Sequence, residues 1–112
     1  DQIRHYTYGA DLARGIRLCI EDENALNEDF NLSTDESTDV LALARMIWQK
    51  VYGDDVPFRY VSDEPFRYDV QKRIPSTEKA KRLLRFEAPT PLTDILDIVI
   101  PWVKEQIEKG MI

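Results

Sequence analysis

The sequence predicts an α+β domain that is mainly helical and has a small sheet. Apolar residues recur with helical spacing in several segments, and short stretches with strand character lie between them. Strands and helices do not alternate as βαβ repeats, which argues against a large parallel sheet. Because 112 residues suffice for a single core, residues 1–112 are treated as one domain.

The first element is expected to be a short strand. Residues 3–8 are rich in β-branched and aromatic side chains, and Gly9 ends the stretch. A helix follows with Asp11 in its first turn, where a carboxylate suits the helix dipole. We expect its apolar residues to form one buried stripe: Leu12, Ala13, Ile16, Cys19 and Ile20.

The middle of the chain contains the best-defined helix. Residues 21–29 are acidic and read as a solvated loop, and residues 30–32 are expected to form a short strand. Ser37 or Thr38 suits the N-cap of the next helix. Apolar residues then keep a helical period for more than three turns: Val40, Leu41, Leu43, Ala44, Ile47, Trp48 and Val51.

Prolines divide the second half of the chain. Residues 57–61 have strand character, whereas residues 66–74, between Pro65 and Pro75, are expected to be extended or irregular.

Two more helices are expected near the end of the chain. Ser76 is the expected cap of a short helix, and a last helix should begin near Thr93. Pro101 lies inside that last helix and predicts a kink or a break. Trp48 and Trp102 fall on apolar stripes and are expected in the core.

Composition excludes several classes of function. The 21 Asp and Glu against 15 Lys and Arg give a net charge of -6, which disfavours binding to nucleic acid or an anionic membrane. No apolar stretch is long enough to span a bilayer. Cys19 is the only cysteine and His5 the only histidine, so neither an internal disulfide, a Cys/His metal site nor a histidine-based triad is expected. Cys19 should be a small core residue, His5 should face solvent or a partner, and a cytoplasmic protein fits best.

Four segments resemble, in order and spacing, the C-terminal part of the extended short-chain dehydrogenase/reductases. This family includes nucleotide-sugar epimerases, dehydratases and decarboxylases. The segments are residues 4–15, with Arg, aromatic residues and Asp-Leu-Ala; Phe30-Asn31-Leu32-Ser33-Thr34; residues 69–80, with Asp-Val, Arg, Pro and Lys-Ala; and residues 83–89 before the final helix.

The resemblance implies a substrate-binding lobe for a nucleotide sugar. It places Arg4 and Arg73 on the diphosphate or the ribose of the nucleotide, and we expect both to converge on the diphosphate. Asn31 and Asp69 are expected in the adjoining substrate-facing loops, and Arg67 is a third candidate cation. The alternative for these positions is ordinary solvated side chains.

The resemblance also implies parts outside this sequence. NAD and the catalytic Tyr/Lys pair would belong to a Rossmann domain on the N-terminal side, because no glycine-rich turn here links a strand to a helix. The sequence is therefore expected to be a fragment that is inactive alone, pairs with that domain, and forms homo-oligomers through uncovered apolar surface. Tyr68 and Lys72 match the spacing of the catalytic pair, but we reject them because the prolines around them disfavour the necessary helix. A protein-interaction module without a small ligand is the alternative function.

Overall fold

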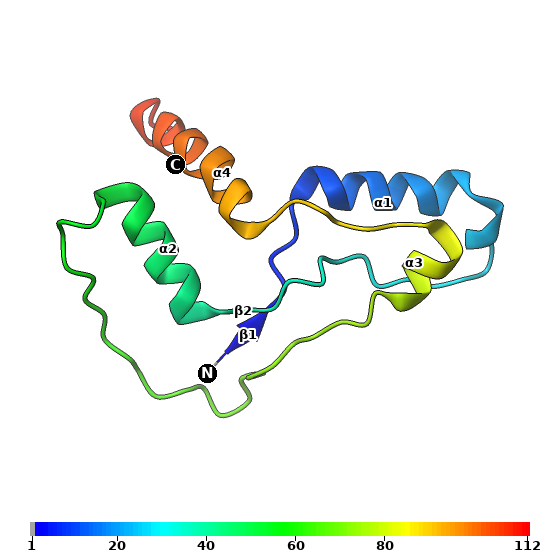
Figure 1. Ribbon diagram of the computed structural model, residues 1–112, viewed down its shortest axis with the longest axis horizontal. Helices are drawn as coiled ribbons and strands as arrows, with labels where there is room; N and C mark the ends of the chain where they lie inside the picture. Colours follow the sequence, from blue (N-terminus) through cyan, green and yellow to red (C-terminus); the bar gives the residue numbers. More distant parts are fainter. Residues whose placement is uncertain (1) are drawn as a thin grey trace.

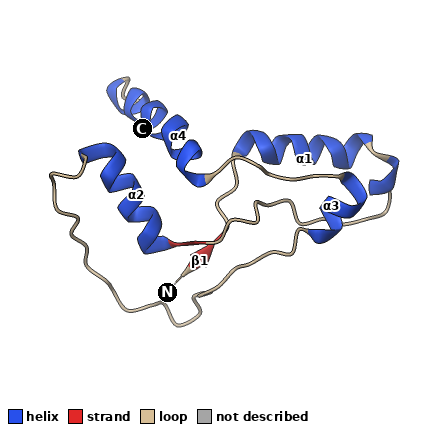
Figure 2. Cartoon of the chain, in the orientation of Figure 1, coloured by secondary structure: helices blue, strands red, loops and turns tan. Residues whose placement is uncertain are grey.

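The computed structural model describes residues 2–112 as four α-helices, one 3₁₀ helix and a two-stranded sheet, which confirms the α+β class (Figure 1). Figure 2 shows that long loops connect these elements. The elements are β1 (Ile3–Arg4), α1 (Gly9–Glu21), η1 (Glu23–Ala25), β2 (Thr38–Asp39), α2 (Val40–Tyr52), α3 (Glu78–Leu84) and α4 (Leu92–Glu108).

Strand β1 joins three segments that are far apart in sequence. It pairs antiparallel with β2, with Ile3 opposite Asp39 and Arg4 opposite Thr38. On its other side, the Ile3 N–H donates to the Gln71 carbonyl at 2.8 Å, and the Arg73 N–H donates to the Ile3 carbonyl at 3.1 Å. These bonds fix Arg4 and Arg73 next to each other.

The strand expectations were correct only in part. The first strand covers two residues of the expected 3–8, and residues 30–32 and 57–61 form no strand. Residues 57–61 are largely exposed, so strand-forming side chains there lack a sheet face on which to pack. The expected irregular structure of residues 66–74 is confirmed.

The core lies between α1, η1 and α3. Its buried centre consists of Ala25, Ala80, Leu84 and Phe86, and partly buried side chains surround it: Leu18, Cys19, Phe30, Leu32 and Ala88.

The expected buried stripe of α1 is wrong. Leu12, Ile16 and Ile20 are 36%, 49% and 79% exposed. The helix instead turns Gly15 toward Phe86, because the absence of a side chain at Gly15 lets the backbone approach the ring closely. The spacing of apolar residues located this helix correctly. The face that it predicted to be buried is left uncovered by the rest of the chain.

Helices α2 and α4 pack against each other, apart from the α1 and α3 core (Figure 1). An ion pair of 2.5 Å between Lys50 and Asp97 links them. The expected cap at Ser37 or Thr38 is wrong: Asp39 caps α2, and its carboxylate accepts the Ala42 N–H at 3.0 Å. Trp102 is 56% exposed, so its expected place in the core is also wrong.

The two C-terminal helices begin close to the expected positions. Helix α3 has Thr77 rather than Ser76 at its N-cap, and the Thr77 hydroxyl donates to Asp35 instead of capping the helix. Helix α4 continues through Pro101 without the break that we considered.

The chain is more open than a compact domain of its length. Its radius of gyration is 17.1 Å, against about 13 Å for a compact chain of this size. Its accessible surface is 8665 Å², whereas a compact monomer of this mass exposes about 6,400 Å². Among residues 2–112 there is no helix with the length and apolar character to cross a membrane.

Candidate functional site

A cavity of about 700 Å³ lies where β1, the loop after η1 and the segment before α3 meet. We call it the arginine cavity, since Arg4 and Arg73 both line it; its wall also includes His5, Tyr6, Phe30 and Asn31. Its volume is within the range of small-molecule sites. The structure thus brings together three of the four expected site residues, Arg4, Arg73 and Asn31.

Arg4 has a double role in this geometry. Its Nη1 donates to the Ile3 carbonyl at 2.9 Å and to the Gln71 carbonyl at 3.3 Å, and its Nη2 donates to the Val70 carbonyl at 2.6 Å. Its guanidinium also lies 3.9 Å from the Asp69 carboxylate. Since a guanidinium has five N–H donors, two remain for a ligand after these three bonds. Arg4 therefore fastens residues 69–71 to β1 while facing the cavity.

Arg73 is the more available cation. Its backbone is held by the bond to Ile3, and its guanidinium has no ion-pair partner within residues 2–112. An arginine with a fixed backbone and an uncommitted planar fork suits an incoming phosphate.

Asn31 orders the wall of the cavity. Its Nδ2 donates to the Ser76 carbonyl at 3.2 Å, which ties the loop after η1 to the segment that carries Arg73. This is the backbone-holding role that the residue type suggested.

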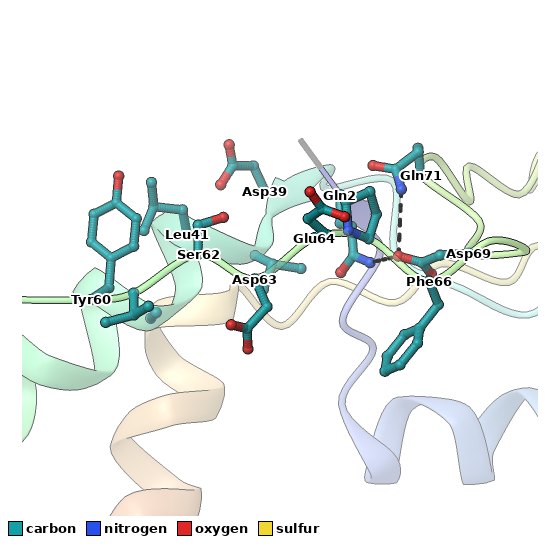
Figure 3. A pocket seen from close by; sticks show the side chains of 14 residues that line it. Gln2, Asp39, Leu41, Tyr60, Ser62, Asp63, Glu64, Phe66, Asp69 and Gln71 are labelled. Atoms are coloured by element: carbon teal, nitrogen blue, oxygen red, sulfur yellow. Dashed lines mark hydrogen bonds between the residues drawn. The ribbon is translucent and has the colours of Figure 1, made fainter.

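A second cavity of about 570 Å³ adjoins the first, and Gln2 and Val40 line both. We call it the acidic cavity, because four carboxylates line it: Asp39, Asp63, Glu64 and Asp69 (Figure 3). Asp69, the fourth expected site residue, is therefore outside the arginine cavity, where it accepts hydrogen bonds from Gln2 and, at 3.4 Å, from Gln71 (Figure 3). Four carboxylates repel phosphate, so the arginine cavity is the place for an anion.

His5 lies at the arginine cavity, although the sequence did not mark it as a candidate. It is among the residues that line the cavity, and its ring is bonded within the chain, with Nδ1 2.7 Å from the Thr34 carbonyl and Nε2 2.7 Å from the Ser37 hydroxyl. The position of the His5 ring depends on the close approach of residues 34–37 to β1, which no local pattern in the sequence predicts. Gln2 could have been found, because it is two residues from Arg4 and side chains at this spacing share a face of an extended strand.

Asp35 is the charged group behind His5. Its carboxylate accepts from Lys81 and from the Thr77 hydroxyl, and these bonds, the one to Lys81 above all, lower the pKa of Asp35. Burial opposes the shift, while the charges of Lys81 and His5 add to it. Asp35 therefore stays ionised near His5.

The remaining candidates do not join the site. Arg67 lies over the Tyr68 ring, 5.3 Å from its centroid, and lines neither cavity. Tyr68 is 85% exposed and lies in a turn, so residues 68–72 do not form the helix that the spacing of Tyr68 and Lys72 would require for such a pair.

The glycines of the described residues lie within helices or just after them. Gly9 and Gly15 belong to α1, and Gly53 and Gly110 follow the ends of α2 and α4, so no glycine-rich turn in residues 2–112 joins a strand to a helix. The same residues contain no group of three His, Cys, Asp or Glu side chains arranged for a metal ion.

Comparisons with known proteins point to one family. No protein-family model matches the chain. UDP-glucuronic acid decarboxylase 1 of Xenopus tropicalis is 28% identical over 109 residues, which are 96% of this chain and 24% of that protein. The solved UDP-glucose 4-epimerase of Thermotoga maritima, in complex with UDP-glucose, is 28% identical with a TM-score of 0.80, over 95% of this chain and 33% of that one. The Bordetella bronchiseptica enzyme WbmF, solved with NAD⁺ and UDP, is 25% identical with a TM-score of 0.70, over 95% of this chain and 31% of that one.

Fold and sequence together define the class. The chain matches the C-terminal part of extended short-chain dehydrogenases/reductases in fold and, at 28% identity, in sequence. It spans about a quarter to a third of the length of these relatives. Two of them are named for a nucleotide sugar, UDP-glucuronic acid and UDP-glucose.

Proposed function

We propose that this chain is the substrate-binding domain of an NAD-dependent nucleotide-sugar epimerase or dehydratase. The observation that carries the proposal is the convergence of Arg4 and Arg73 on one cavity of about 700 Å³. A nucleotide sugar offers a diphosphate, for which two arginines provide charge and paired donors. Relatives whose names and complexes include UDP-glucose, UDP and UDP-glucuronic acid support the same ligand class.

The four candidate residues have different roles in binding that ligand. Arg73 binds the diphosphate with its uncommitted fork, and Arg4 adds the two donors that its loop contacts leave over. Asn31 and Asp69 support the site indirectly, since each forms a hydrogen bond that holds a loop in the wall of a cavity. The sugar end of the ligand then extends from the arginine cavity toward the rest of the protein.

The reaction itself belongs to a second domain. In our proposal, NAD and the catalytic Tyr/Lys pair are held by a Rossmann domain N-terminal to this segment, so residues 1–112 alone bind substrate and are inactive. NAD in the complexes of WbmF and of an Agrobacterium tumefaciens relative supports NAD as the cofactor.

The uncovered surface suits a partner domain. The accessible surface of 8665 Å² exceeds that of a compact monomer of the same mass by about 2,300 Å². This is more area than one domain buries in a typical interdomain interface. Exposed apolar side chains on two helices contribute to this excess: Leu12, Ile16, Ile20, Ile98 and Trp102. Leu12 also lines the arginine cavity, so a domain on the α1 face would lie next to the ligand.

The same apolar faces favour the second candidate, a protein-interaction module that binds no small ligand. The two proposals differ in one prediction, since only the substrate-binding domain is expected to bind a nucleotide.

Calorimetric titration of the 112-residue chain with UDP-glucose tests the proposed function. The unchanged protein should bind, and Arg73→Ala should weaken binding at least about tenfold, because a hydrogen bond to a charged group contributes about 1.5–3 kcal/mol. Arg67→Ala is the matched control, since Arg67 lines neither cavity, and it should bind like the unchanged chain. A folded chain that does not bind UDP-glucose leaves the interaction module as the better explanation.

A further inference from the structure

We propose that the arginine cavity selects a nucleotide sugar whose sugar is uncharged and hydroxylated, and that Thr7 and Ser33 accept hydrogen bonds from hydroxyls of that sugar. A uronic acid in the same position should be disfavoured. This inference rests on the proposed function and deepens it, because it names the class of sugar. The relatives leave the class open, since their names include both UDP-glucose and UDP-glucuronic acid.

The side chains of Thr7 and Ser33 lie together in the wall of the cavity. Their hydroxyl oxygens are 3.3 Å apart. Thr7 follows Arg4 by three residues, which span at most about 11 Å. The sugar of a nucleotide sugar is bonded directly to the second phosphate. The two hydroxyls are therefore within reach of the sugar when the diphosphate lies on the arginines.

The hydrogen bonds of this pair determine where its protons lie. The Ser33 hydroxyl donates to the Thr34 carbonyl at 3.0 Å, and a carbonyl can only accept. Since the single proton of Ser33 is used in that bond, the Thr7 hydroxyl is the donor in the contact between the two side chains. The Thr34 N–H in turn donates to Oγ1 of Thr7 at 3.1 Å. Both hydroxyl protons are thus engaged within the chain.

The pair consequently offers a ligand acceptors and no donor. A hydroxyl has one proton and two lone pairs, so each of the two oxygens keeps one free lone pair after these bonds. Ser33 is 9% exposed, and a ligand bond to its oxygen would be largely shielded from water. A sugar hydroxyl can donate to these oxygens, whereas an ionised carboxylate only accepts and would face their lone pairs.

The charges of the cavity match a diphosphate and no further anion. Among residues 2–112, the arginines and lysines that line it are Arg4 and Arg73. The diphosphate of a nucleotide sugar carries two negative charges, which two guanidinium groups balance. Arg4 also lies 3.9 Å from the Asp69 carboxylate, which uses part of its charge. A uronic acid would add a third negative charge, for which these lining residues provide no further cation.

The adjoining acidic cavity strengthens the selection. Gln2 and Val40 belong to the walls of both cavities, so the four carboxylates of the acidic cavity lie close to the arginine cavity. Like charges repel, and the net charge of -6 acts in the same direction. The diphosphate has arginines beside it to offset this repulsion, but a carboxylate on the sugar would not.

Calorimetric titration of the 112-residue chain with UDP-glucose and with UDP-glucuronic acid tests the selection. The two ligands differ only at C6 of the sugar, which is a hydroxymethyl group in one and a carboxylate in the other. UDP-glucose should bind about tenfold or more tightly, because of the uncompensated charge of the uronic acid. Equal affinities, or tighter binding of UDP-glucuronic acid, overturn the proposal and leave the proposed function intact.

Two variants test the hydroxyls. Thr7→Val and Ser33→Ala should each weaken the binding of UDP-glucose about threefold to tenfold, because each removes an acceptor. The binding of UDP, which has no sugar beyond the diphosphate, should stay unchanged. Thr7→Ser keeps the hydroxyl and should bind UDP-glucose like the unchanged chain. Ser33→Ala leaves the bond from the Thr34 N–H to Thr7 in place, so it tests the proposal even if Thr7→Val fails to fold.

The comparison with UDP separates recognition of the sugar from a structural role. An equal loss of UDP and UDP-glucose binding would make the hydroxyls structural and overturn their role at the ligand. Unchanged binding of UDP-glucose by Ser33→Ala would overturn it as well. Absence of binding of all three nucleotides by the unchanged chain would overturn the proposed function together with this inference.

Discussion

Gly15 lies directly against the ring of Phe86. A Cβ at Gly15 would lie 2.8 Å from Cε2 of Phe86 and 3.1 Å from Cδ1 of Leu32. Phe86 is fully buried, so its ring has little space into which to move. Helix α1 therefore rests on the core at a position that requires glycine for its small size rather than for its backbone freedom.

Gly15→Ala should lower the free energy of unfolding by about 1–2 kcal/mol, because overpacking outweighs the gain in helix propensity. Gly9→Ala is the matched control, since its Cβ would meet nothing within 4 Å, and its stability should be unchanged or slightly higher. Urea unfolding followed by circular dichroism measures both. Equal stability of the two variants would show that Phe86 yields without strain.

Asp11 should make the fold sensitive to acid. Burial tends to raise the pKa of Asp11, but hydrogen bonds from Thr90 and the pairing with Arg14 outweigh it and lower that pKa. Because the pKa of Asp11 is lower in the folded chain than in the unfolded chain, its ionised form stabilises the fold at any pH above the unfolded-state pKa, which is near 4. This stabilisation is lost as the pH falls through the folded-state pKa.

Unfolding in urea at several pH values between about 5 and 2 should therefore show falling stability, and Asp11→Asn should show a smaller fall. Asp55→Asn, at an exposed position, should keep the acid dependence of the unchanged chain. If Asp11→Asn retains the full dependence, other carboxylates are responsible, with Asp35 as the next candidate.

Pro101→Ala should stabilise helix α4. Pro101 is exposed inside the helix, where it lacks the N–H that an alanine would donate to the preceding turn. The expected gain is about 1–3 kcal/mol in the free energy of unfolding.

Pro91→Ala is the contrasting variant. Pro91 occupies the N-cap with a φ of -64°, which proline adopts without strain, so alanine there should lose about 0.5–1 kcal/mol. A loss of stability in Pro101→Ala would mean that the ring makes contacts more valuable than the missing bond.

The isolated chain should self-associate at high concentration. The exposed face of α4 includes Ile98 and Trp102, which are 49% and 56% exposed and lie one turn apart. Light scattering should detect dimers or larger species, and Trp102→Arg should reduce them. A monodisperse monomer at high concentration would contradict this expectation.

Local patterns predicted the helices well and their packing poorly. The spacing of apolar residues located α1, α2 and α4, because helical periodicity is encoded within each segment. The same patterns placed Ile16 and Trp102 in a core that this chain does not form around them. An apolar stripe predicts that a face will be covered, but it does not identify the covering element.

Residues of the site could be predicted where they match the family resemblance or lie on the same strand as a residue that does. Arg4, Arg73 and Asn31 were found by resemblance, and the structure places all three on one cavity. His5 was missed because its position depends on hydrogen bonds to Thr34 and Ser37, which are about thirty residues away along the chain. Asp39 was missed as the cap of α2 because Ser37, Thr38 and Asp39 are all good capping residues.

The position of β1 between β2 and residues 71–73 also sets the order of events during synthesis. The strand leaves the ribosome before either of its partners. About 70 residues must be synthesised between Ile3 and its hydrogen-bond partner Gln71, which takes several seconds at usual elongation rates. Helices α1 and α2 can form from neighbouring residues during that interval, whereas the pairing that brings Arg4 beside Arg73 cannot. The nascent chain should therefore acquire its helices first and its ligand-binding cavity last.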